Sequence, residues 1–156
     1  MRSADGAGRS ACVRRGGATS GRSLRSVDVE QAAQRWRATW ERAWPAKDVE
    51  AIVALYADEA EYRALVHRQP ELGPAGVRSY LRRMFLEEDQ ITCRFGEPIV
   101  AGDRAAVEWW ATWVEDGDDL TMAGATLLRF GATGLVVDHR DYWNQTDTIT
   151  PPFPGW

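Results

Sequence analysis

Two side chains able to move protons, His139 and Asp141, stand two positions apart in a segment that reads as a β-strand. Alternate residues of a strand point to the same face, so both side chains can meet one substrate. The apolar residues Leu135, Val137 and Trp143 share this face, which favours an inward orientation for the pair. An imidazole beside a carboxylate suits proton transfer at a carbon next to a carbonyl. The structural alternative is that Asp141 only holds a backbone amide or an arginine.

A further candidate acid, Glu108, lies among tryptophans in another β-rich run. Glu108 and Trp110 share one face of that strand, whereas Trp109 points to the other face. If the first face lines a pocket, Glu108 becomes a candidate general acid or base and Trp110 a wall of the pocket. The alternative is an ion pair across the sheet with Arg129 or Arg140, or a place at a dimer surface. In either case one of the adjacent tryptophans should line the pocket and the other the outer surface.

Two residues near the middle of the chain are further candidates. Tyr62 has the small neighbours Ala60 and Ala64 on its strand face, which leaves room for a ligand that its hydroxyl can hydrogen-bond. Packing in the core is the alternative for Tyr62. His67 lies on a polar loop, where we expect it to face solvent or the rim of the pocket.

The first half of the chain reads as helices. Apolar residues recur every three or four positions from Val29 to Trp44, which predicts one buried face of an amphipathic helix. Asp28 with Gln31 reads as a capping box, and Pro45 ends the helix. The three tryptophans at positions 36, 40 and 44 are expected to pack against a sheet, with the wall of a cavity for a planar hydrophobic ligand as the alternative.

Shorter elements follow this helix. We expect a second helix from Asp48 to Tyr56, a strand over residues 60–66, and a third helix that begins at Gly73-Pro74. Beyond Asp89 the apolar period changes to two, and short turns separate long β-rich runs at 104–114, 119–130 and 134–144.

These patterns indicate an α+β fold. Short turns between long strands specify antiparallel hairpins, so the second half should form a meander of four strands, joined by the strand that contains Tyr62. Helices followed by strands indicate three N-terminal helices packed on one side of a curved, mostly antiparallel sheet. A ligand pocket is expected between the helices and the sheet.

The length of 156 residues leaves room for one ordinary domain with tails. Residues 1–26 hold six arginines and one acidic residue without apolar periodicity, and we expect a disordered basic tail, with a binding arm or a targeting peptide as alternatives. The domain itself is expected over residues 27–147, and residues 148–156 read as a proline-rich extended tail. Because the chain carries a net charge of −4 despite its basic start, the domain is acidic, which disfavours binding to nucleic acid.

Several other classes of protein are disfavoured. No apolar run approaches the roughly 18 residues of a membrane span. The cysteines Cys12 and Cys93 offer no disulfide framework, which favours a reducing cytoplasm. The two histidines are far apart and no glycine-rich phosphate loop occurs, so we expect no metal site and no cofactor. The expected partners are a small hydrophobic molecule and a second copy of the chain, with neither membrane nor nucleic acid.

Residues 28–147 resemble the SnoaL-like branch of the nuclear-transport-factor-2-like superfamily. The resemblance rests on the order of the elements, on a closing run from Gly134 to Trp143, and on the motif Leu55-Tyr56-Ala57-Asp58-Glu59-Ala60. It implies a cone-shaped half-barrel, commonly dimeric, with a pocket at the open end. The superfamily includes polyketide cyclases, ketosteroid isomerases, dehydratases, epoxide hydrolases and proteins that only bind, so the fold alone does not select a reaction.

The family's site residues distinguish these reactions. The general base of the ketosteroid isomerases falls on Ala64 and their second acid on Thr126, which argues against that chemistry. The acid–base aspartate on the last strand of the SnoaL-type cyclases falls on Asp141. The resemblance therefore implies a cofactor-independent cyclase, isomerase or dehydratase acting on a small apolar carbonyl compound.

In this interpretation Asp141 is the leading acid or base, and Glu108 or His139 is its partner. The ligand-binding candidates are Tyr62, Trp110, Thr126 and Trp143. The alternative function is a non-catalytic module of the same fold that binds a ligand or forms a dimer. A homodimer through the outer face of the sheet is expected from the resemblance.

Overall fold

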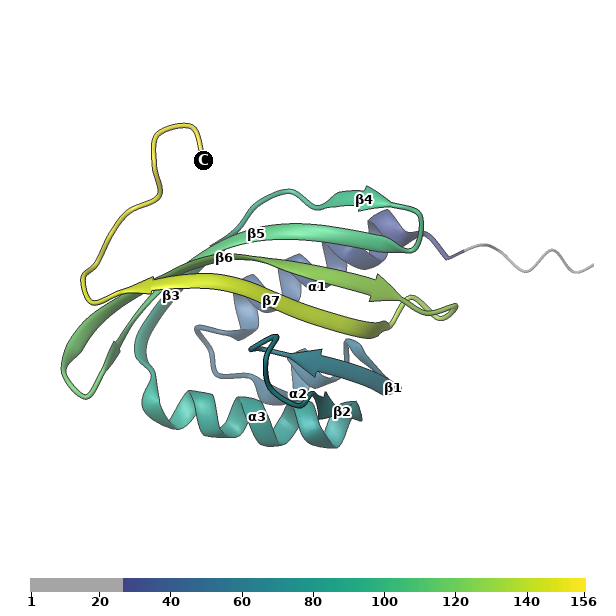
Figure 1. The fold of residues 1–156 in the computed structure, drawn as a ribbon, viewed down its shortest axis with the longest axis horizontal. Coiled ribbons are helices and arrows are strands. Elements are labelled where there is room, and N and C mark those ends of the chain that lie inside the picture. The colour runs from purple at the N-terminus through teal and green to yellow at the C-terminus, as the bar shows by residue number, and fades with distance from the viewer. Residues whose placement is uncertain (1–26) are drawn as a thin grey trace, which may run out of the picture.

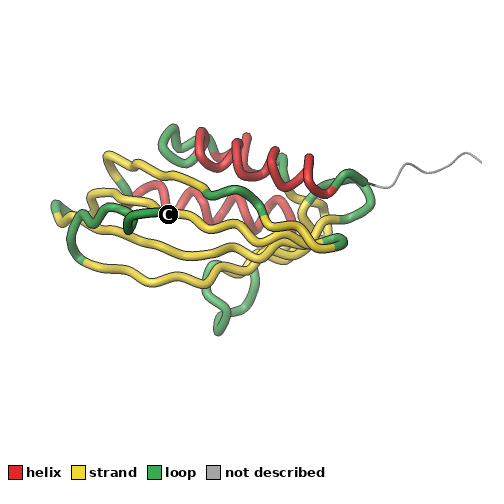
Figure 2. The backbone as a smooth tube through the Cα atoms, turned by 90° about the horizontal axis from the view of Figure 1, so that it is seen from above, coloured by secondary structure: helices red, strands yellow, loops and turns green. Residues whose placement is uncertain are grey.

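One curved, open sheet and three helices form the two layers of the protein, with the helices on one face of the sheet (Figures 1 and 2). The structure is a computed structural model and describes residues 27–156. The elements along the chain are α1 (Val29–Ala43), α2 (Val49–Val53), β1 (Tyr56–Arg63), β2 (Glu71–Leu72), α3 (Gly73–Glu87), β3 (Asp89–Phe95), β4 (Ile99–Ala101), β5 (Arg104–Glu115), β6 (Asp118–Phe130) and β7 (Val136–Thr146).

The strands of the sheet lie in the order β2-β1-β7-β6-β5-β3, and β4 pairs with β5. Strands β5, β6 and β7 are joined by short turns, and β3 pairs antiparallel with β5, so these are the four antiparallel strands that were predicted, whereas β1 runs parallel to β7. This arrangement confirms the predicted α+β half-barrel. The parallel pairing matters for the site because it brings Tyr62 beside His139.

Helix α1 forms as its sequence pattern predicts. The Asp28 side chain accepts a hydrogen bond from the backbone N–H of Gln31 at 3.0 Å and caps the first turn. The apolar face is buried, with Trp36 and Trp40 at 1% and 4% exposure. Burying these indoles against the sheet stabilises a helix whose opposite face is polar.

The boundary between α2 and β1 differs from the prediction. The short helix ends at Val53, and the strand begins at Tyr56, where a helix was expected to continue. The reason is tertiary: the backbone N–H of Val136 donates to the carbonyl of Leu55 at 2.9 Å, and Tyr56 pairs with Val136. Pairing with a strand far along the chain overrides the local helical pattern.

Helix α3 begins at the predicted Gly73-Pro74 pair. Gly73 has a φ of +59°, and a Cβ atom there would lie 2.7 Å from the carbonyl oxygen of Asp58, so only glycine fits this close approach. Val77, Leu81 and Phe85 are buried and hold the helix against the inner face of the sheet.

The C-terminal residues after β7 turn back across the outer face of the sheet (Figure 1). The indole N–H of Trp110 donates to the carbonyl of Thr150 at 2.8 Å, and the rings of Phe153 and Trp156 pack edge-on against Trp110. The expectations for the basic tail over residues 1–26 and for Cys12 lie outside the described residues. Within the described part of the chain, no helix has the length and apolar character needed to cross a membrane.

Candidate active site

A cavity of about 180 Å³ lies between α1, α3 and the inner face of the sheet. Its walls are mainly aromatic, and Tyr62, Tyr80 and Phe95 are among them. Six of the eight tryptophans of the chain also line it: Trp36, Trp40, Trp44, Trp109, Trp113 and Trp143. A cavity with aromatic walls on which polar side chains converge has the character of a small-molecule site.

The carboxylate of Asp141 is held by side chains from three strands. Its Oδ1 accepts a hydrogen bond from the Thr126 hydroxyl at 2.5 Å and lies 2.8 Å from Nε2 of His139. Its Oδ2 accepts a longer bond, of 3.3 Å, from the Tyr62 hydroxyl. The Thr126 hydroxyl in turn accepts from the indole N–H of Trp109 at 2.9 Å. Asp141 therefore has one tightly held oxygen and one that is held more loosely.

A buried tyrosine orients His139. The hydroxyl of Tyr56 lies 2.8 Å from Nδ1 of His139, and the imidazole is 1% exposed. Burial raises the pKa of Tyr56 well above its ordinary value, and the nearby indoles of Trp36 and Trp40 offset this only in part. A carboxylate only accepts, so Nε2 of His139 is the donor to Asp141, and Nδ1 can then accept from the Tyr56 hydroxyl, which keeps its proton.

Two further tyrosines remain neutral donors beside Asp141. Burial raises the pKa of Tyr62 well above its usual range, and the charges of Tyr80 and Asp141 add to this effect. Burial likewise raises the pKa of Tyr80, and the charge of Asp141 again contributes. Both hydroxyls therefore carry protons over the whole physiological range and can donate hydrogen bonds to a ligand.

A comparison with known families decides the relationship of the chain. The family model described as SnoaL-like domain matches residues 30–139, from the first turn of α1 to His139 in β7. The chain belongs to the SnoaL-like family. No curated protein matches the sequence.

Solved structures with the same fold are distant in sequence. One is SalBIII, an epoxide hydrolase/cyclase-like enzyme in pyran ring formation of the polyether salinomycin, with a TM-score of 0.65 at 19% identity over 75% of this chain and 93% of its own. A hypothetical protein from Catenulispora acidiphila with a ketosteroid isomerase-like fold, in complex with trimethylamine, has a TM-score of 0.61 at 20% identity over 67% and 82% of the two chains. An NTF2-like protein of unknown function from an Exiguobacterium species has a TM-score of 0.62 at 19% identity over 72% and 98%.

The SnoaL-like fold brings most of the predicted site residues to the cavity. They are Tyr62, Thr126, His139, Asp141 and Trp143. The indole N–H of Trp143 donates to the carbonyl of Ala64 at 2.9 Å, which holds the ring at the wall of the cavity.

Two predicted residues, Glu108 and Trp110, lie on the outer face of β5, and the expectation that they face the pocket is corrected here. Trp109 is 5% exposed and lines the cavity, so strand alternation turns its neighbours outward. Glu108 is exposed and, within residues 27–156, makes no salt bridge with Arg129 or Arg140. Strand periodicity separates two faces but does not say which is inner, and both faces of β5 carry tryptophan.

The predicted alternation along the last strand holds only in part. His139, Asp141 and Trp143 line the cavity, but Val136 rather than Val137 joins the main core cluster. The register between β6 and β7 shifts at the start of β7, which inserts one residue and reverses the face of the positions before it.

Three carboxyl groups of the cavity, from Glu87, Glu88 and Glu115, were not found from the sequence, and Glu88 is the buried one. Glu88, directly after α3, is 5% exposed and accepts a hydrogen bond from the indole N–H of Trp44 at 2.8 Å. Burial raises the pKa of Glu88 to about 7, and this hydrogen bond offsets the effect only in part. The helical repeat in the sequence indicated that position 88 is buried, because Glu88 follows the buried residues Leu81 and Phe85 by seven and three positions.

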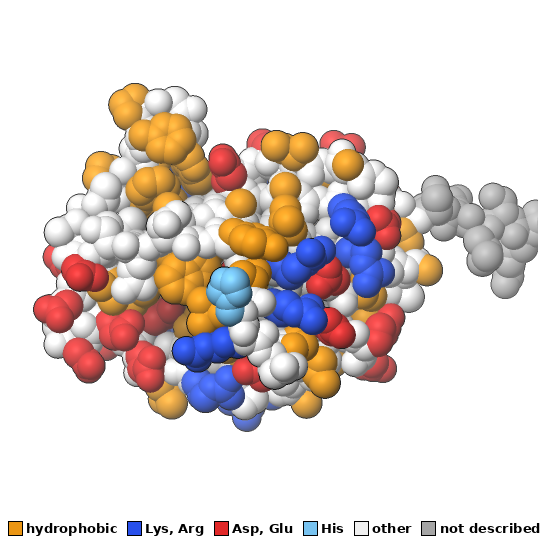
Figure 3. Space-filling model, viewed as in Figure 1, with side chains coloured by type: hydrophobic (Ala, Val, Ile, Leu, Met, Phe, Trp, Pro, Cys, Tyr) orange, Lys and Arg blue, Asp and Glu red, His pale blue; other side chains and the backbone are white. Residues whose placement is uncertain are grey.

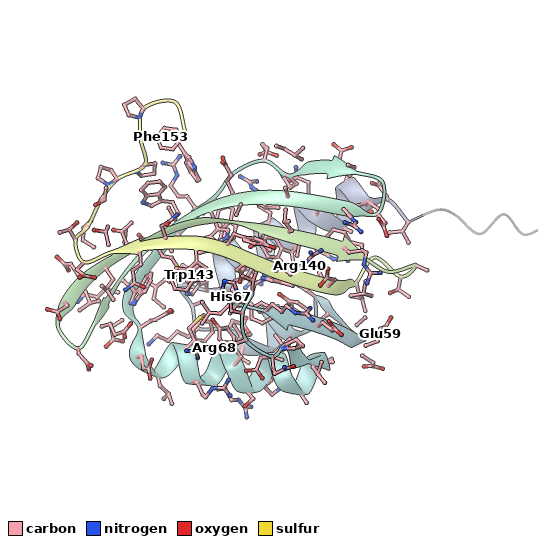
Figure 4. All side chains as sticks on the ribbon, in the orientation of Figure 1. Glu59, His67, Arg68, Arg140, Trp143 and Phe153 are labelled. Carbon is pink, nitrogen blue, oxygen red and sulfur yellow. The ribbon has the colours of Figure 1, made fainter. Side chains whose placement is uncertain are left out.

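His67 lies exposed on the loop after β1 (Figure 4) and is not among the described residues that line the cavity. Within the described residues, no group of three or more His, Cys, Asp or Glu side chains is arranged to hold a metal ion. The chemistry that the cavity offers thus comes from Asp141, His139, the two tyrosine hydroxyls and Glu88.

Proposed function

We propose that the cavity binds a small, mostly apolar carbonyl compound and that Asp141 moves a proton at the carbon next to its carbonyl, without a cofactor. The observation that carries this proposal is the Asp141 carboxylate, which lines an aromatic cavity while side chains of three strands hold it in place. A positioned base inside a largely apolar cavity is the arrangement that general acid–base catalysis requires.

The two oxygens of Asp141 have different roles in this proposal. Oδ1 is occupied by Thr126 and His139, which set the orientation of the carboxylate. Oδ2 has only the longer bond from Tyr62, so it is the oxygen that a substrate proton reaches. His139 is a positioning residue, and its other ring nitrogen is hydrogen-bonded to Tyr56.

Removing a proton next to a carbonyl leaves negative charge on the carbonyl oxygen, and that charge needs donors. Tyr62 and Tyr80 both line the cavity, and their ring centroids are 5.1 Å apart. Because burial raises the pKa of both hydroxyls, each can donate without losing its proton. They are the proposed donors to the enolate oxygen, with Tyr62 turning to it once Oδ2 of Asp141 has taken the substrate proton.

The fold neighbours support a reaction of the cyclase or isomerase type. SalBIII is described as epoxide hydrolase/cyclase-like, and another neighbour has a ketosteroid isomerase-like fold. In this chain Ala64 and Thr126, which line the cavity, occupy the places of the two ketosteroid isomerase acids, so a cyclisation, dehydration or other isomerisation that starts from Asp141 is proposed instead.

Proton exchange tests this proposal with a panel of model compounds. We would incubate the protein in deuterated water with small apolar ketones and aldehydes and follow loss of the α-proton signal by NMR. The wild type should accelerate exchange for at least one compound, and Asp141→Asn should remove the acceleration. Glu108→Gln, on the exposed outer face, is the matched control and should behave as wild type. Equal exchange by Asp141→Asn and wild type would refute the role of Asp141.

A non-catalytic ligand-binding module is the second candidate function. The neighbour from Catenulispora acidiphila is a complex with trimethylamine, so a protein of this fold can hold a small organic molecule. This alternative predicts that Asp141→Asn leaves every measurable property of the protein unchanged except ligand affinity.

We also propose a homodimer in the cytoplasm. Leu127 and Tyr142 remain 38% and 48% exposed on the outer face of the sheet, where a second copy would cover them. Within residues 27–156 the thiol of Cys93 is not in a disulfide, which agrees with a reducing compartment. Light scattering coupled to gel filtration tests the dimer, and Leu127→Lys should convert it to a monomer.

A further inference from the structure

The charged groups of the cavity wall are acidic. Four carboxyl groups line it, from Glu87, Glu88, Glu115 and Asp141, and among residues 27–156 neither a lysine nor an arginine does. On the surface, acidic side chains gather at the end of the molecule where α3 ends and β5 turns into β6 (Figure 3). A cavity of this charge attracts cations and repels anions.

Glu88 is the carboxyl group among these that has the least compensation for its burial. It is 5% exposed, and within the described residues its one side-chain hydrogen bond is the bond from Trp44 to Oε2. Among the described residues no lysine or arginine lies within 4 Å of this carboxyl group, and Lys47 pairs with Asp89 instead. A buried carboxylate without a cation is unfavourable, so a cationic ligand group would supply the missing partner.

The walls around Glu88 are indole rings. Trp44 donates to Glu88, and Trp113 donates to Glu115 Oε2 at 3.0 Å, so two tryptophans each present a ring beside a carboxyl group. Tryptophan is the aromatic residue that attracts cations most strongly, and aromatic cages bind alkylated ammonium groups. An ammonium group near Glu88 would gain from the carboxylate and from the rings together.

We propose that this end of the cavity, formed by Glu88, Glu115, Trp44 and Trp113, is an ammonium-binding subsite. The inference rests on the proposed function only in so far as the cavity is a ligand site, and it names the class of ligand: a small compound that carries a positively charged amine.

The subsite lies apart from the acid–base network. Trp36 and Trp40 contact the His139 ring, with centroids 5.7 and 6.1 Å from it, whereas Trp44 contacts Glu88. Trp40 precedes Trp44 by about one helical turn, or about 6 Å along the axis. One ligand can therefore place its ammonium group at Glu88 and a carbonyl at Asp141, which is the pattern of a short amino ketone.

The ionisation of Glu88 gives the subsite a pH signature. Burial raises the pKa of Glu88 to about 7, with Glu115 and Glu87 adding to the rise and Lys47 opposing it. A cation binds the ionised form, so affinity for a permanently charged ligand should increase about tenfold between pH 6 and pH 8. A neutral ligand of the same shape should show no such increase.

The test compares choline with 3,3-dimethylbutan-1-ol, which has the same shape but a carbon in place of the charged nitrogen. Isothermal titration calorimetry on the wild type at pH 8 should find choline bound at least tenfold more tightly. The advantage should shrink about tenfold at pH 6. Glu88→Gln should weaken choline binding about tenfold, remove its pH dependence, and leave the binding of the alcohol unchanged. Glu59→Gln, on an exposed strand position, is the matched control (Figure 4).

The outcomes test the ammonium subsite and the catalytic role of Asp141 separately. Equal affinity for both probes, a preference for the alcohol, or no binding of either would overturn the ammonium subsite, and Asp141-dependent proton exchange would still stand on its own. Choline binding that depends on Glu88 without any Asp141-dependent exchange would support the subsite and refute the catalytic role. The comparison of the two probes uses only wild-type protein, so it holds even if Glu88→Gln does not fold.

Discussion

The hydroxyl of Thr126 connects the indole of Trp109 to the carboxylate of Asp141. It accepts the indole N–H of Trp109 and donates to Asp141 Oδ1. Thr126 is 1% exposed, so water cannot replace either bond. A buried donor that loses its partner is destabilising even when the volume of the side chain is kept.

Thr126→Val should therefore lower the free energy of unfolding by about 1–3 kcal/mol. The change keeps the shape but leaves the Trp109 N–H unpaired and Asp141 with one donor fewer. Urea denaturation measures the loss. Thr92→Val is the control, because the hydroxyl of Thr92 hydrogen-bonds at the exposed surface and its removal should change stability by less than about 0.5 kcal/mol. Equal losses in both variants would contradict the account of the network.

Glu88 should make the protein less stable as the pH rises. Burial raises its pKa to about 7 from an ordinary value of 4.5, so between these values the folded protein holds a proton that the unfolded chain has released. The free energy of unfolding contributed by this group then falls across that window by about 3 kcal/mol and is constant above it.

The comparison with Glu88→Gln isolates this effect, because glutamine keeps an acceptor for Trp44 but does not titrate. Urea unfolding at pH 5 and pH 8 should show that the wild type loses more stability than the variant over this interval. Parallel pH profiles for the two proteins would mean that Glu88 is ionised in the folded state like an exposed glutamate.

At the scale of elements, periodicity in the sequence was enough to place the long helices and strands. The repeat of apolar residues in α1 and the alternation in β5 each follow from local geometry. Local geometry does not determine which distant strand or helix an element pairs with. The inner face of β5, the early start of β1 and the irregular start of β7 all depend on pairing between distant strands.

The sequence likewise indicated the part of the candidate site that depends on spacing within one strand. His139 and Asp141 share a strand face, so their pairing follows from spacing alone. The donors to Asp141 come from β1 and β6, which approach it only in the folded sheet. Glu88 was missed because a carboxyl group at the end of a helix is usually exposed, and only the surrounding tryptophans make it buried.

The C-terminal segment is an element of its own, and deleting residues 151–156 should affect stability but not ligand binding. The deletion removes the rings of Phe153 and Trp156 from Trp110 on the outer face, away from the cavity. Edge-on aromatic pairs contribute roughly 0.5–1.5 kcal/mol each, so the thermal midpoint should fall by several degrees.

Differential scanning calorimetry measures this shift, and the choline titration provides the control. An unchanged midpoint would show that the segment does not hold to the sheet in solution. A changed choline affinity would show that it reaches the cavity.

At the scale of the whole molecule, aromatic and acidic side chains are distributed unevenly. Most of the tryptophans surround one cavity, and the lysine-free and arginine-free wall that the described residues give it carries four carboxyl groups. Six indoles around a cavity stabilise the fold less than six indoles in a filled core would, because the atoms that line a cavity have no packing contacts on the cavity side. We therefore propose that the molecule is organised around a ligand site.

Native mass spectrometry of freshly purified protein tests this claim most directly, with Ala64→Trp as the comparison. Ala64 is a small residue on the cavity wall, and an indole there would fill the space. The account predicts that the wild type carries a bound small molecule, that the variant folds with the same subunit number, and that it carries none. An empty wild type, or the same bound mass in both proteins, would contradict the claim that this cavity is the functional site.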